Sequence, residues 1–339
     1  MEMLVERLIQ IGYFAGQAVV VVAALLILIS FIFNLAMKSQ HKAELEVEDL
    51  KLKYERLGKD LKTSSMSKKE LKTLLKAEKK AKKKKEEPLP TVYVINFEGD
   101  MRAHAVDNLR EEISAVLTAA TDQDEVVVCI ESPGGVVHGY GLAAAQLLRV
   151  KNRGIKLTAC VDKVAASGGY LMACVADQII SAPFAIIGSI GVIAQVPNFH
   201  RLLKKHDIDY REITAGEFKR TVSLLGEITD KGEQKFLEQI TETHQLFKEF
   251  VKTNRPQVDV TQIATGEYWY GNRAKELKLV DEIMTSDDFL LKNIADKNMK
   301  KISFQKKKKL SERLGLSAAK VASQTADLIW QKLESSKYL

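Results

Sequence analysis

The chain has 339 residues, of which 46% are hydrophobic and 28% are charged. This composition excludes a wholly disordered chain and allows one large domain, or two ordinary ones, with a sizeable core. Three cysteines without a C-x-x-C pair exclude a disulfide scaffold and a cysteine-based zinc ribbon. Cys129, Cys160 and Cys174 each lie in an apolar stretch, so we expect them to be packing residues.

The net charge of +7 is unevenly distributed along the chain. Residues 1–37 carry 1 basic and 2 acidic side chains, and residues 38–87 carry 17 basic and 10 acidic ones. Residues 88–296 carry 22 basic and 29 acidic side chains, and residues 297–339 carry 11 basic and 3 acidic ones. The expected core is therefore acidic, and the positive charge lies in its flanks. This distribution argues against a basic nucleic-acid groove in the folded domain and suits solvated linkers or contact with an anionic membrane.

An uncharged stretch, residues 8–37, lies near the amino terminus. It is longer than the roughly 20 residues that a helix needs to cross a bilayer. Glu2 and Glu6 precede it, and it contains no clear cleavage site, unlike a secretory signal peptide. We therefore expect residues 1–37 to form a retained transmembrane anchor.

Two further segments flank the expected core. Residues 38–90 are rich in Lys and Glu with scattered leucines, which predicts a charged, partly helical tether, or alternatively a partner-binding coiled coil. Residues 297–339 combine a basic start with apolar residues at helical spacing. They predict a basic amphipathic tail that packs on its own protein or lies on a membrane.

Between these flanks, residues 91–296 alternate between strand and helix patterns, which indicates α/β architecture with crossover connections. The uncharged residues 179–196 contain Pro183 and Pro197 follows them, so we expect buried strands there and no second membrane span. Apolar runs predict strands at 92–97, 126–130 and 155–161, and helical periodicity predicts helices at 106–120, 142–150, 168–175, 232–251 and 273–277.

Ser167 follows the predicted strand 157–161 and precedes an apparent helix. A serine at such a turn is exposed by the bend and lies at the positive end of the helix dipole, which favours developing negative charge. The local sequence is not the G-x-S-x-G elbow, and no H-E-x-x-H or phosphate-binding glycine motif occurs. By itself the motif is more typical of a helix cap than of a nucleophile.

Two other positions could supply chemistry. The turn Ser132-Pro133-Gly134-Gly135 follows an apolar strand, and paired glycines can direct two N–H groups to one point, as an oxyanion hole requires. Lys219 lies beside Phe218 and small residues. A lysine held away from water can act as a neutral general base. A plain tight turn and a surface lysine are the structural alternatives.

Together these segments resemble peptidase family S49, the serine peptidases of the signal peptide peptidase A type. The resemblance covers roughly residues 88–290. Five blocks carry it in family order: 126–135 (VVVCIESPGG), 165–170 (AASGGY), 188–192 (GSIGV), 215–219 (AGEFK) and 271–281 (GNRAKELKLVD).

The resemblance implies a ClpP/crotonase-like fold of repeated ββα units and a Ser–Lys dyad without metal or cofactor. Ser167 matches the nucleophile and Lys219 the general base. Gly168 and the Pro-Gly-Gly turn, Gly134 and Gly135, match the oxyanion-hole donors. Ser189 matches a hydroxyl that holds the lysine amine.

The same resemblance implies peptide substrates, including remnants of signal peptides, and a homo-oligomer with the dyad shared between adjacent subunits. We therefore expect Ser167 and Lys219 of one protomer to lie apart. The anchor implies contact with membrane lipid and a bacterial inner-membrane location. Basic residues after the anchor favour a cytoplasmic catalytic domain, whereas some family members face the other side. A crotonase-like acyl-thioester enzyme and a non-catalytic scaffold are the rival functions.

Overall fold

The computed structural model describes residues 44–67, 69, 70, 72 and 89–305 of the chain. Both sheets lie in one compact unit, Leu45–Phe304. The expected anchor at 1–37, residues 38–43, 68, 71 and 73–88 of the expected tether, and the tail beyond residue 305 lie outside the described residues. Among the helices that are described, none is both long enough and apolar enough for a bilayer crossing.

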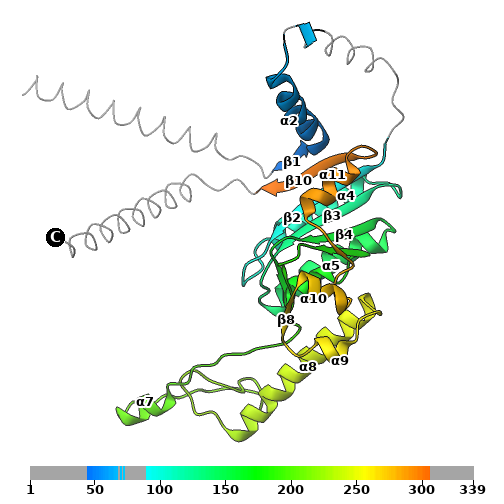
Figure 1. The fold of residues 1–339 in the computed structure, drawn as a ribbon. Coiled ribbons are helices and arrows are strands. Elements are labelled where there is room, and N and C mark those ends of the chain that lie inside the picture. Colours follow the sequence, from blue (N-terminus) through cyan, green and yellow to red (C-terminus); the bar gives the residue numbers. More distant parts are fainter. Residues whose placement is uncertain (1–43, 68, 71, 73–88, 306–339) are drawn as a thin grey trace, which may run out of the picture. The chain divides into compact units, whose positions relative to one another are not determined.

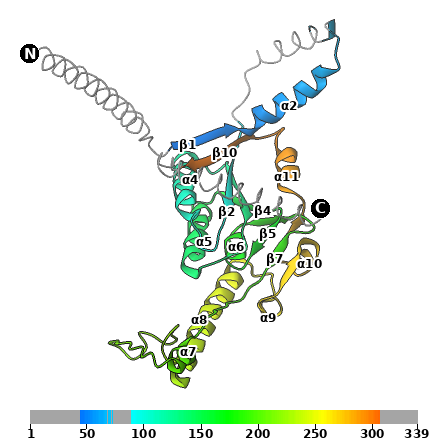
Figure 2. The same cartoon turned by 90° about the vertical axis from the view of Figure 1, so that its left-hand side faces the viewer.

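In the described part of the chain the strands form two sheets (Figures 1 and 2). The large sheet has the order β1-β10-β2-β3-β4-β6-β9, and its pairs from β10 to β9 are all parallel. The strands are β1 (Glu44–Asp49), β2 (Thr91–Glu98), β3 (Glu125–Glu131), β4 (Lys156–Val161), β6 (Gln178–Ser181), β9 (Glu282–Ile283) and β10 (Asn298–Gln305). The chain is thus α/β, as expected, with a sheet rich in parallel pairs.

Helices cover both faces of the large sheet, and Figure 2 shows them on its two sides. On one face α4 (Val106–Ala119), α5 (Val137–Asn152) and α6 (Gly168–Ala173) bury a core that includes Ile95, Val128 and Leu157. On the other face α2 (Leu50–Ser64) and α11 (Ser286–Asn293) cover a smaller core that includes Val94 and Cys160. The continuous apolar strands follow from this burial on both faces.

The small sheet has the order β5-β7-β8, made of β5 (Val164–Ala166), β7 (Ile186–Gly188) and β8 (Tyr268–Tyr270). β5 pairs in parallel with β7, and β7 pairs antiparallel with β8. β4, β5 and α6 follow one another as a strand–strand–helix unit whose strands lie in different sheets. This small sheet, and not the large one, carries the strand that ends just before Ser167.

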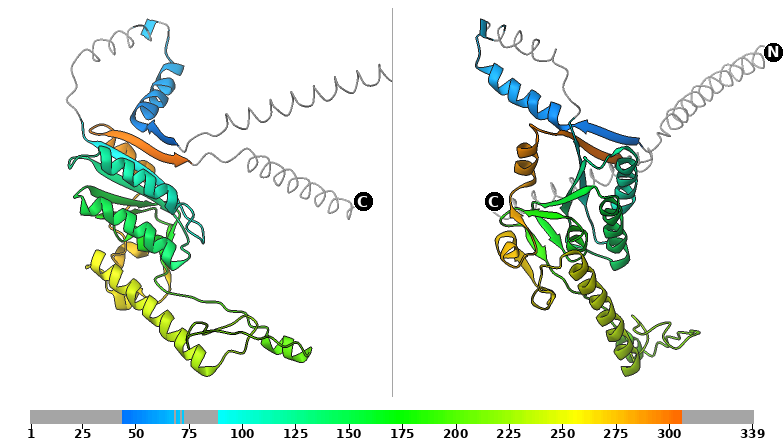
Figure 3. Two further views of the ribbon diagram at one scale, coloured as in Figure 1. Left: turned by 180° about the vertical axis from the view of Figure 1, so that it is seen from behind. Right: turned by 90° about the vertical axis from the view of Figure 1, so that its right-hand side faces the viewer.

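A long helix and an extended arm complete the described fold (Figure 3). The arm runs from residue 191 to residue 229 and contains the short helix α7 (His200–Lys205). It leads into α8 (Asp230–Asn254). The arm lies beside this helix, and both extend away from the sheets. The remaining helices are α9 (Val260–Ile263) and α10 (Gly271–Glu276).

Several predicted elements differ from the structure. Residues 179–196 form strands only as far as Gly188, and Ile193 beyond them is 79% exposed, so the prediction of buried strands was wrong for the second half. The helix predicted at 142–150 begins at Val137, and Gly139 inside it lies close to Ala103, where a side chain would not fit. The sheet also extends past the expected domain limits of 91–296, since β1 and β10 both join it.

Candidate functional site

Ser167 stands between the end of β5 and the first residue of α6. Its backbone has φ 51° and ψ −117°, a conformation that costs a non-glycine residue about 1–3 kcal/mol. Two hydrogen bonds hold it: the Ser167 N–H donates to Gly188 O at 2.7 Å, and the Leu171 N–H donates to Ser167 O at 2.9 Å. The side chain does not cap α6, and no described residue hydrogen-bonds to its hydroxyl, which is thus free for another partner.

The Pro-Gly-Gly turn lies directly against this serine. A β-carbon on Gly134 would lie 2.7 Å from the Gly168 nitrogen and 2.8 Å from Ser167 Cβ, so only glycine allows this approach. Gly134 also has φ 89°, which favours glycine. The contact is maintained by a parallel bridge between Ser132 and Ala165, which joins the end of β3 to β5. Two of the five sequence blocks thus form one local structure.

The three candidate oxyanion donors differ in how their N–H groups are used. The Gly134 N–H donates to Ser132 Oγ at 3.1 Å, so it is already engaged inside the turn. For Gly135 and Gly168, no described backbone or side-chain group accepts the N–H. Both residues line a pocket together with Ser167. The geometry therefore favours Gly135 and Gly168 as donors and gives Gly134 a spacing role.

A buried hydroxyl chain, which the sequence analysis missed, supports the turn. Tyr140 of α5 donates its phenolic hydrogen to Asp100 O at 2.8 Å, and its oxygen lies 2.5 Å from Ser132 Oγ. Since the Tyr140 hydrogen is used on Asp100, the Ser132 hydroxyl donates to Tyr140 and accepts from Gly134. Burial raises the pKa of Tyr140, which keeps the phenol protonated. The one sequence feature that could have predicted this role is the helical spacing that places Tyr140 on the buried face of α5.

Ser189 lies beside Ser167, just past the ends of two paired strands of the small sheet. Ala166 and Gly188 are register partners of β5 and β7, so the residues that follow them leave the sheet side by side. Ser189 has φ 51°, and its N–H donates to Glu267 O at 2.7 Å. The structure therefore brings Ser189 next to the predicted nucleophile.

Lys219 lies elsewhere, in the arm, where its side chain is exposed. The neighbouring Phe218 ring packs under the ammonium groups of Lys231 and Lys235, at 5.7 and 5.5 Å from the ring centroid. This contact fixes the segment against the first turns of α8. Lys219, the next residue after Phe218, therefore lies near the amino-terminal end of that helix.

The Ser167 pocket uses the opposite end of α8. Its walls there are Leu246, Phe247 and Phe250. The two stretches are about fifteen residues apart, which at a rise of 1.5 Å per residue is roughly 20 Å along the axis. That separation is far beyond hydrogen-bond reach, so one protomer does not bring Lys219 to Ser167.

The pocket beside Ser167 is apolar and has a volume of about 360 Å³. Besides the α8 residues, Val137 of α5, Leu171 of α6 and Ile193 of the arm line it. Three helices and the arm thus surround the serine with hydrocarbon. Such a pocket suits an apolar group of a ligand placed next to Ser167.

Among the described residues, no three His, Cys, Asp or Glu side chains gather closely enough to hold a metal ion. Besides Ser167, the residues that line its pocket are glycines, apolar residues, Tyr140 and Thr243, so the lining offers no charged group that would hold a phosphate or a metal. What this arrangement offers is a hydroxyl, two N–H groups and an apolar cavity.

Comparison with known proteins places the chain among peptidases. A model of the peptidase family S49 N-terminal region matches residues 6–147, and a model of peptidase family S49 matches residues 149–300. A probable protease SohB of Haemophilus influenzae is 49% identical over 336 residues, which cover 94% of this chain and 95% of the relative.

Two further relatives extend this picture. A probable protease SohB of Buchnera aphidicola is 50% identical over 234 residues, which cover 69% of this chain and 70% of the relative. A putative protease of Methanocaldococcus jannaschii is 32% identical over 172 residues, which cover 49% and 54% of the two chains. The resemblance inferred from the five sequence blocks is thereby confirmed.

Proposed function

The chain belongs to peptidase family S49, and from this membership we propose that it is a serine endopeptidase with Ser167 as nucleophile and Lys219 as general base. One observation carries the proposal: Ser167 has an unengaged hydroxyl beside the Gly135 and Gly168 amides, at an apolar pocket. A crotonase-like enzyme would need no serine here, and a scaffold would need no such pocket.

The proposed reaction proceeds through an acyl-enzyme. Neutral Lys219 takes the Ser167 proton as Ser167 Oγ attacks the peptide carbonyl carbon. The resulting ammonium gives that proton to the leaving amine as the C–N bond breaks. Lys219 then takes a proton from water, the hydroxide attacks the ester, and Ser167 Oγ leaves and is protonated again.

The tetrahedral intermediates carry negative charge on the former carbonyl oxygen. The Gly135 and Gly168 amides would donate to it, and each such donor typically lowers the barrier by about 3 kcal/mol. Gly168 is the first residue of α6, but that helix has only six residues, so the two amides rather than its dipole are the main stabilising groups.

We propose that the dyad is completed between two copies of the chain. The roughly 20 Å along α8 separates Ser167 from Lys219 within one protomer. The arm that carries Lys219 exposes large apolar side chains, including Ile213 at 95% and Ile208 at 55%. An exposed apolar surface of this kind favours association. Packing on a neighbour would cover Lys219, and loss of water favours its neutral amine.

The pocket points to apolar residues next to the cleaved bond. Leu171, Leu246 and Phe250 offer no charged or hydrogen-bonding group to a substrate side chain. Peptides from the apolar region of signal peptides have this chemistry, so such remnants are proposed substrates. A membrane anchor at residues 1–37 would place the enzyme at a bacterial inner membrane, where these remnants are produced.

The direct test is cleavage of an unstructured peptide library by the detergent-solubilised full chain. We expect wild type to cleave beside apolar residues, and Ser167→Ala and Lys219→Ala to be inactive. Lys205→Ala, another exposed lysine of the arm, is the matched control and should cleave normally. Equal cleavage by wild type and Ser167→Ala would exclude the proposed nucleophile.

Mixing the two inactive variants tests whether the dyad is shared. If Ser167 and Lys219 of one site come from different protomers, a one-to-one mixture reassembled from subunits has an intact pair at about a quarter of its sites. We therefore expect about a quarter of the wild-type rate. If each protomer supplies its own pair, the mixture stays inactive.

A further inference from the structure

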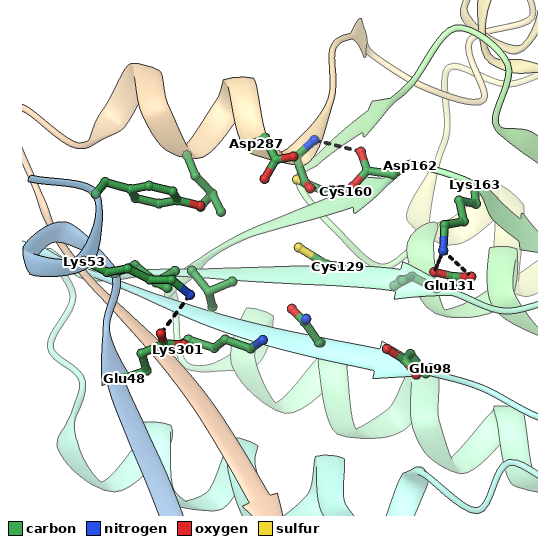
Figure 4. Close-up of a pocket in the computed structure, with 17 residues that line it drawn as sticks. Glu48, Lys53, Glu98, Cys129, Glu131, Cys160, Asp162, Lys163, Asp287 and Lys301 are labelled. Atoms are coloured by element: carbon green, nitrogen blue, oxygen red, sulfur yellow. Dashed lines mark hydrogen bonds and ion pairs between the residues drawn. The ribbon is translucent and has the colours of Figure 1, made fainter. Parts of the chain in front are cut away.

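A second pocket lies on the face of the large sheet that is covered by α2 and α11, away from Ser167 (Figure 4). It has a volume of about 240 Å³. β2, β3, β4 and β10 form its floor, and Lys53 of α2 and Asp287 of α11 stand at its walls. None of the peptidase chemistry proposed above uses this pocket.

Two of the three cysteines meet on its floor. Cys129 of β3 and Cys160 of β4 are register partners, and both line the pocket. Neighbouring strands lie about 4.8 Å apart. Disulfides usually join residues whose Cα atoms are about 4.4–6.8 Å apart. Since both side chains are on the same face, the two sulfur atoms are placed for a bond.

The two thiols differ in access. Cys160 is 1% exposed, whereas Cys129 is partly exposed to the pocket. The interaction with Cys129 and, to a smaller extent, burial raise the pKa of the Cys160 thiol. Cys160 therefore keeps its proton. This leaves Cys129 as the sulfur that an oxidant reaches first, with Cys160 as its resolving partner.

We propose that Cys129 and Cys160 are a modification site, a dithiol that peroxides convert reversibly to a disulfide. The Cys129 thiolate attacks one peroxide oxygen, the O–O bond breaks, and the leaving oxygen takes a proton, giving sulfenic acid and water. The Cys160 sulfur then attacks Cys129 Sγ, the S–O bond breaks, and the Cys160 proton leaves with the hydroxide as water. Two thiols and one hydrogen peroxide thus become one disulfide and two waters.

Cys174 provides an internal control. It is fully buried on the other side of the sheet, and its Sγ donates to Leu171 O at 3.2 Å. Burial raises its pKa to about 12, so it stays a thiol. Neither of the other two cysteines shares its face, and we expect it to remain reduced.

The disulfide would also act on the catalytic site. β3 leads directly into the turn of Gly134, and β4 is followed by β5 and Ser167. A bond between Cys129 and Cys160 pulls together the two strands that position these turns. We therefore expect oxidation to reduce peptide hydrolysis several-fold. This consequence rests on the proposed peptidase activity, whereas the disulfide itself does not.

Peptide mapping tests the disulfide directly. The full chain is treated with hydrogen peroxide, alkylated with N-ethylmaleimide under denaturing conditions and digested with trypsin. Each cysteine then lies on its own peptide, at residues 111–149, 157–163 and 164–201. We expect the first two peptides to be cross-linked, about 2 Da lighter than their sum, and to separate on reduction with dithiothreitol.

The third peptide should carry an alkylated Cys174, and Cys174→Ser should leave the cross-link intact. Cys129→Ser and Cys160→Ala should abolish it. The proposal is overturned if both thiols remain alkylated after peroxide treatment, or if Cys129 is oxidised to sulfinic acid with Cys160 still alkylated. Because wild type is mapped directly, poor folding of a variant does not decide the outcome.

Peptide hydrolysis by the same samples tests the consequence. The rate should fall on oxidation, recover with dithiothreitol, and be insensitive to peroxide in Cys129→Ser. A cross-linked enzyme with an unchanged rate overturns the effect on catalysis and leaves the modification site standing. An enzyme inactive before oxidation refutes the proposed function, and the mapping result still decides the disulfide.

Discussion

Replacing Tyr140 by Phe removes one oxygen from the hydroxyl chain behind the Pro-Gly-Gly turn. The ring, which also lines the Ser167 pocket, is kept. The lost hydroxyl donates to Asp100 O and accepts from Ser132 Oγ. Asp100 is exposed, so water can replace its partner. Ser132 is 0% exposed, so its hydroxyl loses its acceptor without a substitute.

The magnitude follows from that one orphaned group. A buried donor without a partner costs about 1–3 kcal/mol, so we expect the free energy of unfolding to fall by about 2 kcal/mol. The Gly134 N–H is held by the same Ser132 oxygen, and the Gly135 amide follows it in the chain. A rotated Ser132 would let the turn shift and weaken the Gly135 amide as an oxyanion donor. Such a donor lowers the barrier by about 3 kcal/mol, and losing about half of that stabilisation lowers kcat roughly tenfold.

The assay measures urea unfolding together with kcat and KM on one apolar peptide. We expect kcat to fall with little change in KM, since the hydrocarbon walls are unaltered. Tyr170→Phe is the control: it also deletes a buried hydroxyl, which donates to Leu279 O at 2.9 Å, but that bond does not touch the turn. It should reduce stability and leave kcat near the wild-type value.

The reasoning is refuted if Tyr140→Phe loses stability and keeps the wild-type kcat, because the hydroxyl chain would then have no part in positioning the turn. A double variant adds a second check. Once Ser132→Ala has removed the donor, Tyr140→Phe leaves no buried hydroxyl unpaired. Its additional cost in unfolding free energy should therefore be smaller than in the wild-type background.

Three other substitutions have defined outcomes. Gly168→Ala would place a β-carbon 2.3 Å from Tyr140 Cγ, so we expect a loss of about 1–3 kcal/mol in stability and loss of peptide cleavage. Arg255→Ala removes two hydrogen bonds to Asp281, at 2.9 and 2.8 Å, and should cost about 3 kcal/mol by urea unfolding. Burial raises the pKa of Glu112 to about 6, so rising pH ionises a buried carboxyl: relative to Glu112→Gln, wild type should lose about 2 kcal/mol of stability between pH 4.5 and 7.

Matched controls separate these effects from general damage. Gly141 lines the same pocket with nothing near its position, so Gly141→Ala should be tolerated. Arg273 has only an exposed ion pair, and its removal should cost less than about 1 kcal/mol. Glu111 is exposed, so the stability of Glu111→Gln should change with pH as that of wild type does. A Glu112→Gln protein whose stability follows the wild-type pH curve would contradict the assignment of that dependence to Glu112.

The sequence predicted the parts of the fold where local pattern and burial agree. The strands at β2 and β3 and the helix α8 lie where apolar runs and helical periodicity indicated them. β5 and β7 have three residues each, too few for a periodic signal, so the strand that ends at Ser167 was missed. The sequence predicts a basic tail from residue 297, but residues 298–305 form β10. Lys300 and Lys301 interrupt the apolar pattern of this strand, whose register partners lie in β2.

The residues of the candidate site also fall into two groups, those that local sequence predicts and those that depend on tertiary packing. The blocks around Ser167 and Gly135 could be matched because each needs small residues at a fixed spacing. Tyr140 and Ser132 could not, because their hydroxyl contact depends on how α5 crosses the end of β3. Lys219 is exposed on the arm, so its proposed role as a base depends on a surface that a second copy of the chain would provide. No pattern in one chain describes such a surface.

α8 gives this separation a functional meaning. One end of the helix builds the pocket wall beside Ser167, and the other end holds the segment of Lys219. A rigid helix cannot bring its two ends together, so under the proposed roles a lone protomer would have its nucleophile and its pocket without the base. A neighbouring copy that supplies Lys219 would complete the site only upon assembly. Under the proposed function, peptide cleavage should therefore rise with the fraction of assembled chains more steeply than with total protein, and dilution should abolish it before any loss of folded structure.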